Sequence, residues 1–173
     1  QELNQTYKDL ELYFDDEVPA DVEQLILSAS EQYSKGGAES CLIKAYEMAP
    51  TNLTVLVALY RFYYYQHRYQ DALRIAYESM AAVADEIEFP PHWRELNFSD
   101  LANGVLHSFT VVRFYLLALK GAGYLNLRMG NIQEGVAMLN KVIELDNNDR
   151  LGARVLLQAM GPAQVSERTA QPL

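Results

Sequence analysis

The chain has 173 residues, of which 50% are apolar and 21% are charged, and its formal net charge is −9. A net acidic chain lacks the basic footprint that a nucleic-acid-binding protein needs to release counterions from phosphates. No uninterrupted apolar run reaches the length of a membrane-spanning helix, so the sequence predicts neither nucleic-acid binding nor membrane insertion.

The acidic charge is concentrated at the start of the chain. Residues 1–31 carry nine acidic side chains and one basic side chain, whereas the remaining residues carry 14 acids and 13 bases. We therefore expect an acidic N-terminal arm over residues 1–20 that is attached to a nearly neutral body.

The first residues lack the basic start and apolar centre of a signal peptide. Cys41 is the single cysteine, so no disulfide forms within the chain, and this favours a reducing compartment. We expect the protein to be cytoplasmic.

Hydrophobic periodicity predicts an all-α chain, because strand and hairpin signals are nearly absent. In chain order, the expected helices cover 21–35, 38–49, 53–66, 70–84, a short helix capped by Ser99 or Asp100, a long helix ending at 129–130, 132–145 and 149–160. Asp21 is the expected N-cap of the first helix, Gly36-Gly37 ends it, and Pro90-Pro91 excludes a helix. Residues 161–173 are expected to form a disordered tail.

The helix pairs recur at a fixed spacing. A helix-turn-helix unit placed over 116–149 has Gly130 at its turn and Gly135 at a small-residue position in its second helix. Gly123 falls where the two helices must approach each other closely. The expected core residues Leu139, Val142 and Leu145 follow at helical spacing.

The same frame fits residues 53–86. Tyr69 follows the turn as an expected core residue, Ala72 takes the small-residue position, and His67 stands where the pattern prefers glycine. A third unit at 21–52 has a turn that is too short, so it is degenerate. Three units meet the minimum that stacked repeats require.

The stretch RMGNIQEGVAMLNKVIELDNND resembles the second half of a tetratricopeptide repeat. It departs from that family in Gly135 for alanine, Asn147 for proline and Asn126 for a first-helix tyrosine. The resemblance implies antiparallel helix-turn-helix repeats that form a short right-handed superhelix over residues 21–160. In this reading residues 87–115 are an insertion and 149–160 form a capping helix.

Cations and tyrosines follow the first helices of the two clear repeats. At helical spacing they form two stripes, which are Arg61, Tyr64, Tyr65 and Arg68 in one repeat and Arg113, Lys120, Tyr124 and Arg128 in the other. In tetratricopeptide arrays such faces line a concave groove that contacts a bound peptide. Arginine forks and lysine charges suit an acidic or carboxylate-bearing partner segment. The alternative is an ordinary solvated face, or one that the insertion residues Phe89, Trp93 or Phe98 cover.

A narrower resemblance concerns GAGYLNLRMGNIQEGVAMLNKVIELD followed by DRLGARVLL. These stretches are similar to the tetratricopeptide proteins encoded with nitrogen-fixation genes, which are called nitrogenase-associated factors. The resemblance implies a bacterial adaptor or chaperone whose partner is a nitrogenase component or an assembly protein. Two other functions stay open, a structural homo-oligomer and a nucleic-acid-binding adaptor.

No catalytic or metal-binding motif is present. The three histidines, His67, His92 and His107, have no ligand spacing, and Cys41 has no second cysteine. Phosphate loops and nucleophile elbows are also missing. We therefore expect no enzyme activity, no catalytic residue, no metal and no cofactor.

Two further hypotheses concern single segments. The acidic stretch from Phe14 to Glu17, FDDE, is expected to lie over the basic groove and to compete with a partner. Trp93, in the insertion 87–115, is interpreted as a plug that packs between repeats. The alternative for Trp93 is an exposed binding anchor.

Overall fold

The computed structural model describes Phe14 and residues 17–160. Most of the expected acidic arm (1–13 and 15–16) and the expected tail (161–173) lie outside the described residues. Helices account for the regular structure of the described part, and no strand occurs there. The prediction of an all-α fold is therefore confirmed for these residues.

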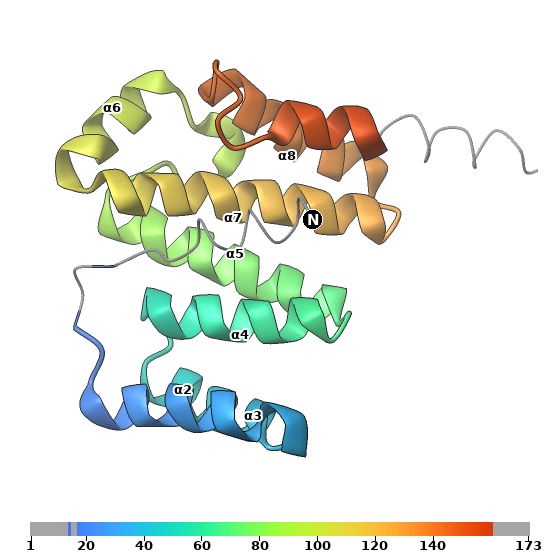
Figure 1. The fold of residues 1–173 in the computed structure, drawn as a ribbon. Helices are drawn as coiled ribbons and strands as arrows, with labels where there is room; N and C mark the ends of the chain where they lie inside the picture. Colours follow the sequence, from blue (N-terminus) through green and yellow to red (C-terminus); the bar gives the residue numbers. More distant parts are fainter. Residues whose placement is uncertain (1–13, 15–16, 161–173) are drawn as a thin grey trace, which may run out of the picture.

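Figure 1 labels the main α-helices of the described part. They are α2 (Ala20–Gln32), α3 (Ala38–Met48), α4 (Leu53–Tyr65), α5 (Tyr69–Glu86), α6 (Phe98–His107), α7 (Phe109–Arg128) and α8 (Ile132–Leu145), with short 3-10 helices η1 (Tyr33–Lys35) and η2 (Trp93–Glu95). Residues 153–160 form a further helix. No helix of the described part is both long enough and apolar enough to cross a membrane.

Two helices begin earlier than their capping residues led us to expect. Helix α2 begins at Ala20 with Pro19 at its N-cap, so Asp21 lies inside the first turn. Helix α6 is capped by Asn97, whose Oδ1 accepts a hydrogen bond from the Asp100 backbone N–H at 3.1 Å. The Asp100 carboxylate accepts the Asn97 N–H in return, at 2.9 Å. This reciprocal capping box, rather than Ser99 or Asp100 alone, sets the start of α6.

The final helix begins at residue 153, four residues later than expected. The carboxylate of Asp146 accepts hydrogen bonds from the backbone N–H groups of Arg150 and Leu151, at 3.1 and 2.8 Å. Asp149 and Gly152 both have positive φ angles, 48° and 74°. These interactions keep residues 146–152 in turns, because aspartate side chains compete with the helix for backbone donors.

Three chain reversals share one backbone geometry. Each contains a residue in the left-handed conformation, with φ of 83° at Gly36, 57° at His67 and 83° at Gly130. In each, the following N–H donates to a carbonyl near the end of the preceding helix, namely Gly37 to Gln32, Arg68 to Tyr63 and Asn131 to Asn126. Such a turn satisfies a helix-end carbonyl and sends the chain back along the helix that it has just left.

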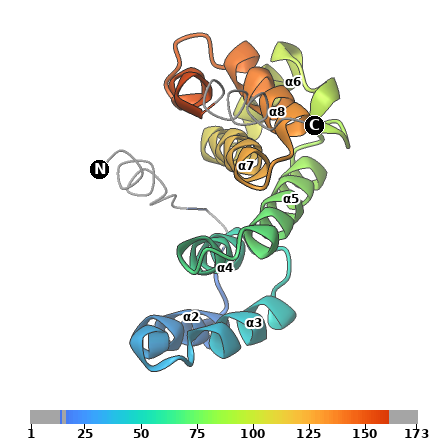
Figure 2. The same ribbon diagram turned by 90° about the vertical axis from the view of Figure 1, so that its right-hand side faces the viewer.

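The helices pack in chain order, except that α6 lies to the side. Helix α2 packs on α3, α3 on α4, α4 on α5, α5 on α7 and α7 on α8, whereas α6 packs on α7. In Figure 2, α2, α4 and α7 lie toward one side of the stack, and α3, α5 and α8 toward the other. Alternate helices therefore share a side of the molecule.

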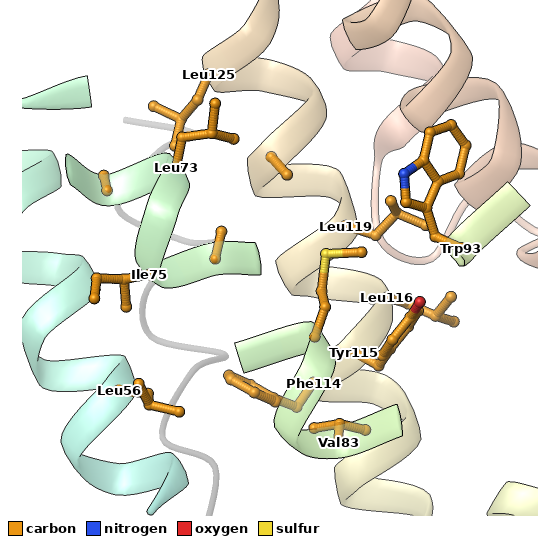
Figure 3. Packing of buried hydrophobic residues seen from close by; sticks show 14 of the residues in the cluster. Leu56, Leu73, Ile75, Val83, Trp93, Phe114, Tyr115, Leu116, Leu119 and Leu125 are labelled. Carbon is orange, nitrogen blue, oxygen red and sulfur yellow. The ribbon is translucent and has the colours of Figure 1, made fainter. Parts of the chain in front are cut away.

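A continuous apolar core runs through the stack. Its fully buried members include Leu56 of α4, Ile75 of α5, Leu119 and Leu125 of α7 and Met138 of α8. Figure 3 shows part of this core, with side chains of α4, α5 and α7 converging between the helices. Burial of these side chains is the main favourable contribution to folding.

Trp93 packs in the core, as the plug interpretation predicts. Its side chain is 7% exposed, and the Arg94 guanidinium lies 4.4 Å from the centre of its ring. Arg94 also forms a 2.5 Å ion pair with Glu134 of α8. Nearby, the Lys141 ammonium donates to the Leu96 carbonyl at 3.1 Å. These contacts tie η2 to α8, and Figure 3 shows the indole among the core side chains.

Helices α7 and α8 approach each other at two glycines, as the repeat pattern predicts. A Cβ atom at Gly135 would lie 2.7 Å from the Leu127 Cγ and 2.8 Å from the Gly123 carbonyl oxygen. A Cβ atom at Gly123 would lie 3.0 Å from the Leu139 Cγ. Because one of these neighbours is backbone, a side chain at Gly135 would force the two helices apart.

We expect Gly135→Ala to lower the free energy of unfolding by about 1–3 kcal/mol, because the added methyl group overpacks the α7–α8 contact. Alanine favours a helix over glycine by only about 1 kcal/mol, which does not offset the clash. Thermal and urea unfolding measure the difference. Asn140→Ala, at an exposed position of the same helix, is the matched control and should lower stability little or not at all. A Gly135→Ala protein as stable as the wild type would contradict the close approach.

Candidate functional site

A cluster of tyrosine rings joins α4 to α7. Tyr64, at the end of α4, has four other tyrosine rings around it, with centroid distances from 5.8 to 6.2 Å. These rings belong to Tyr60, Tyr65, Tyr69 and Tyr124. The distances fall in the range in which aromatic pairs attract each other. We call these five residues, together with Arg128, the Tyr64 cluster.

Helix geometry and a small residue bring the rings together. Tyr60 and Tyr64 lie one turn apart on α4, and their rings are stacked with an interplanar angle of 19°. Across the interface, a Cβ atom at Gly121 of α7 would lie 2.8 Å from the Tyr60 hydroxyl oxygen. The glycine hydrogen thus leaves room for the Tyr60 ring. Tyr124 lies further along the same helix and reaches Tyr64.

Arg128 and His67 flank the Tyr69 hydroxyl. The Arg128 guanidinium carbon lies 5.4 Å from the centre of the Tyr69 ring, within cation–π range, and its Nη2 donates to the Tyr69 hydroxyl at 3.5 Å. The Nδ1 of His67 lies 3.0 Å from the same hydroxyl. Tyr69 is half-buried against the main core, and it also links the α4–α5 turn to the C-terminal end of α7. The sequence predicts Tyr69 only as a core residue and Arg128 only as part of a basic stripe, so this link between them was not predicted.

The members of the Tyr64 cluster differ in exposure. The Tyr65 side chain is 46% exposed and Arg128 is also exposed, whereas Tyr64 is only 9% exposed. Tyr64 was expected to face a partner directly. Tyr64 is instead the support on which the rings of Tyr65, Tyr69 and Tyr124 pack.

Arg68 does not join the cluster. Its Nη1 forms a 2.7 Å ion pair with Glu39 of α3, and its Nε pairs with Asp71 of α5 at 3.0 Å. Its guanidinium also lies 4.6 Å from the centre of the Tyr63 ring. Helical spacing predicts that Arg68 lies on the same face as Arg61. Because α4 ends at Tyr65, Arg68 instead belongs to the turn before α5.

The other basic residues of the two stripes lie on α4 and α7. Arg61, Arg113 and Lys120 are each half-buried. The Lys120 ammonium lies 3.8 Å from the place of a Cβ atom at Gly152, so it is directed toward the loop before the final helix. The structure thus gathers Tyr65, Tyr69 and Tyr124 around Tyr64, with Arg128 held on Tyr69, and Lys120 lies one turn before Tyr124 on α7.

A second surface was not predicted from the sequence. Three apolar side chains at the junction of α6 and α7 are exposed, with Leu106 at 85%, Phe109 at 63% and Val105 at 43%, and Phe98, at the start of α6, is 51% exposed. Helix α6 sits beside α7 at Gly104, where a Cβ atom would lie 2.8 Å from Val112 Cγ2 of α7 and 2.7 Å from the Phe89 ring. In the sequence, this surface is indicated only by the many apolar residues of the insertion 87–115, which matches no position of the repeat.

The Tyr64 cluster offers hydrogen-bond donors and rigid aromatic surface. Phenol hydroxyls and a guanidinium donate hydrogen bonds, and tyrosine rings offer rigid amphipathic area. Among the described residues, no group of three or more histidine, cysteine, aspartate or glutamate side chains is arranged to hold a metal ion.

The comparisons with known proteins place the chain in a family. No protein-family model and no solved structure matches it. Over 156 residues, however, the chain is 47% identical to an uncharacterised 19.8 kDa protein of the nifW 5′ region of Azotobacter chroococcum mcd 1. The aligned residues make up 90% of this chain and 87% of that protein. The chain belongs to the family of that protein.

Membership of the nifW-region family agrees with the predicted association with nitrogen-fixation genes. The resemblance to tetratricopeptide repeats gains no support from a family model, so it stays a prediction.

Burial perturbs the ionisation of the Tyr64 cluster. Desolvation raises the pKa of Tyr60 well above its usual value of 10.0, and the neighbouring hydroxyls of Tyr64 and Tyr124 add to the rise. Desolvation also raises the pKa of Tyr115, in the core beside Phe89, to about 12. Both phenols therefore stay protonated in the folded protein at a pH at which exposed tyrosines ionise.

We expect stability to fall as the pH rises above 10, because the unfolded chain then loses phenol protons that the folded protein retains. Urea unfolding at about pH 8 and about pH 11 measures the loss. Tyr60→Phe should make this loss smaller. Tyr33→Phe, at a ring that is 47% exposed, is the matched control and should change it less. Equal losses in wild type and Tyr60→Phe would show that Tyr60 is not a buried phenol.

Proposed function

We propose that this protein is an adaptor or chaperone that binds another protein through the Tyr64 cluster and transforms no substrate itself. The observation that carries the proposal is the exposure of Tyr65 and Arg128 beside the buried Tyr64 ring and the half-buried rings that pack on it. Tyrosine and arginine dominate the binding energy of protein interfaces. A supporting layer that is already packed also reduces the entropy lost on binding.

We also propose that the fold is a short tetratricopeptide-like superhelix. Support comes from the three reversals with one backbone geometry at Gly36, His67 and Gly130, and from the small residues at the matching positions Ala72 and Gly135. Under this proposal α2–α3, α4–α5 and α7–α8 are the repeats. Residues 87–115 are the insertion, and the final helix is the cap.

The proposed partner is a nitrogenase component or a protein of its assembly. This rests on the relative of the nifW 5′ region and on the resemblance of residues 121–146 to proteins encoded with nitrogen-fixation genes. The proposed location is the cytoplasm. The proposed partner segment is acidic, because Arg128 provides a forked donor and Lys120 and Arg113 provide further positive charge along α7.

One observation favours a second function, a structural homo-oligomer. The exposed apolar side chains at the α6–α7 junction, above all Leu106 and Phe109, form a surface of the kind that association covers. Light scattering over a range of protein concentrations tests this alternative. A mass that rises with concentration, and that stays monomeric in Leu106→Asp, would support it.

Affinity capture from a lysate of nitrogen-fixing cells tests the adaptor function. The full chain is the bait, and the captured proteins are identified by mass spectrometry. We expect a nitrogenase component or assembly protein among them, at a level that falls about tenfold or more in the variant Tyr65→Ala/Arg128→Ala, since hot-spot residues of this type each contribute more than about 1 kcal/mol.

The matched control is Tyr33→Ala/Arg154→Ala, which removes an exposed tyrosine and an exposed arginine from other elements. It should capture as much of the partner as the wild type. Equal capture by the wild type and by Tyr65→Ala/Arg128→Ala would show that the Tyr64 cluster is not the binding site.

A further inference from the structure

His67 occupies a backbone conformation that is strained for its residue type. It lies in the α4–α5 turn with a φ angle of 57°, and the two turns of the same geometry have Gly36 and Gly130 at the equivalent place. Glycine adopts the left-handed conformation without strain, whereas a side chain with a Cβ atom makes it costly. Strain of this kind at a surface turn indicates that the side chain itself has a role.

Packing does not explain the histidine. Its side chain is exposed, so it contributes little to the core. Its Nδ1 lies 3.0 Å from the Tyr69 hydroxyl, and the two rings meet nearly edge to face, with centroids 5.8 Å apart and an interplanar angle of 79°. An exposed hydrogen bond adds little stability because water competes for both partners. The contact instead places the imidazole at the edge of the Tyr64 cluster.

The hydrogen bonds at this edge run in one direction. The Arg128 guanidinium can only donate, and its Nη2 donates to the Tyr69 oxygen at 3.5 Å. The Tyr69 hydroxyl uses its single hydrogen toward Nδ1 of His67. A neutral imidazole that accepts at Nδ1 carries its proton on Nε2. The chain from Arg128 through Tyr69 to His67 therefore ends in a second donor.

Two donors thus lie close together on the surface. Both contacts are made by the Tyr69 oxygen, so Nδ1 of His67 and Nη2 of Arg128 lie at most 6.5 Å apart, the sum of the two distances. Both side chains are exposed, one from the α4–α5 turn and the other from the end of α7. A carboxylate has two oxygens that each accept such a hydrogen bond, so one carboxylate can bridge the two donors.

We propose that His67 is a specificity residue of the partner-binding surface, and that His67 and Arg128 together bind one carboxylate of the partner. The carboxylate is that of a glutamate or aspartate side chain within the partner segment, and the exposed Tyr65 ring contacts its neighbours. This inference rests on the proposed function, and it adds a residue and a chemical group to that site.

The direction of the hydrogen bonds is tested without any ligand. Nitrogen chemical shifts of the His67 ring, measured by NMR at about pH 8, where imidazoles are neutral, distinguish the two tautomers. We expect the proton on Nε2. A proton on Nδ1 would overturn the proposal, because Nε2 would then have no hydrogen to donate to a carboxylate.

The binding probe is the synthetic pentapeptide AFEFA, acetylated and amidated so that its glutamate carries its only charge. The protein has three histidines, so their ring signals report binding separately: His67 at the site, His92 before η2 and His107 in α6. We expect saturable shifts of the His67 signals alone. Equal shifts with the neutral peptide AFQFA would overturn the proposal. Tighter binding of AFQFA with a free C-terminus would overturn the choice of a side-chain carboxylate.

Two variants test the pair of donors. We expect His67→Gly and Arg128→Ala each to bind AFEFA about tenfold more weakly than the wild type, since each removes a donor to a charged group. The affinity is measured from the peptide's own NMR signals. Arg154→Ala, which removes an exposed arginine from the final helix, is the matched control and should bind as the wild type does. Wild-type affinity in His67→Gly would overturn the proposal.

Stability should change in the opposite direction to binding. We expect His67→Gly to raise the melting temperature by about 2–4 °C, because the relief of strain outweighs the loss of one exposed hydrogen bond. A lower melting temperature would show that the side chain serves the fold, and it would overturn the proposal. A merely structural histidine cannot give higher stability together with weaker binding.

This proposal and the adaptor function fail separately. If AFEFA leaves the His67 signals unchanged while capture of a nitrogen-fixation protein still depends on Tyr65 and Arg128, the carboxylate site is wrong and the adaptor function stands. If AFEFA binds as expected but no such protein is captured, the partner assignment fails and the carboxylate site stands.

Discussion

The fold depends on three chain reversals, each with one residue in the left-handed conformation. Glycine takes this conformation without strain at Gly36 and Gly130, whereas His67 takes it at a cost of roughly 1–2 kcal/mol. Because each reversal returns the chain along the preceding helix, alternate helices α4 and α7 share a side of the stack. The Tyr64 cluster exists because of this arrangement, since Tyr64 and Tyr124 come from those two helices.

The insertion between α5 and α7 leaves the stacking of the helices intact. Trp93 fills space against the core, and Arg94 and Lys141 tie the segment to α8. Helix α6 is thereby placed beside α7, and α5 packs directly on α7. The insertion thus leaves the α4–α7 side to the tyrosine rings, and it adds the separate apolar surface around Leu106.

Helix positions were predictable because apolar periodicity and the turn residues agree along most of the chain. The close approach at Gly123 and Gly135 was likewise predictable, since glycines at matching repeat positions indicate that two helices contact each other there.

The candidate site was less predictable. Helical offsets do not continue past the end of α4, so Arg68 was misplaced. Exposure depends on contacts between distant segments, so the burial of Tyr64 was not visible in the sequence.

We propose that the partner binds over the exposed part of the Tyr64 cluster. Hydroxyl-radical footprinting tests it most directly, because exposed aromatic rings mark separate surfaces: Tyr65 the cluster, Tyr33 the first helix pair and Phe98 the insertion. With the captured partner bound to the full chain, we predict slower oxidation of Tyr65 and unchanged oxidation of Tyr33 and Phe98. Unchanged oxidation of Tyr65 together with protection of Phe98 would contradict the account.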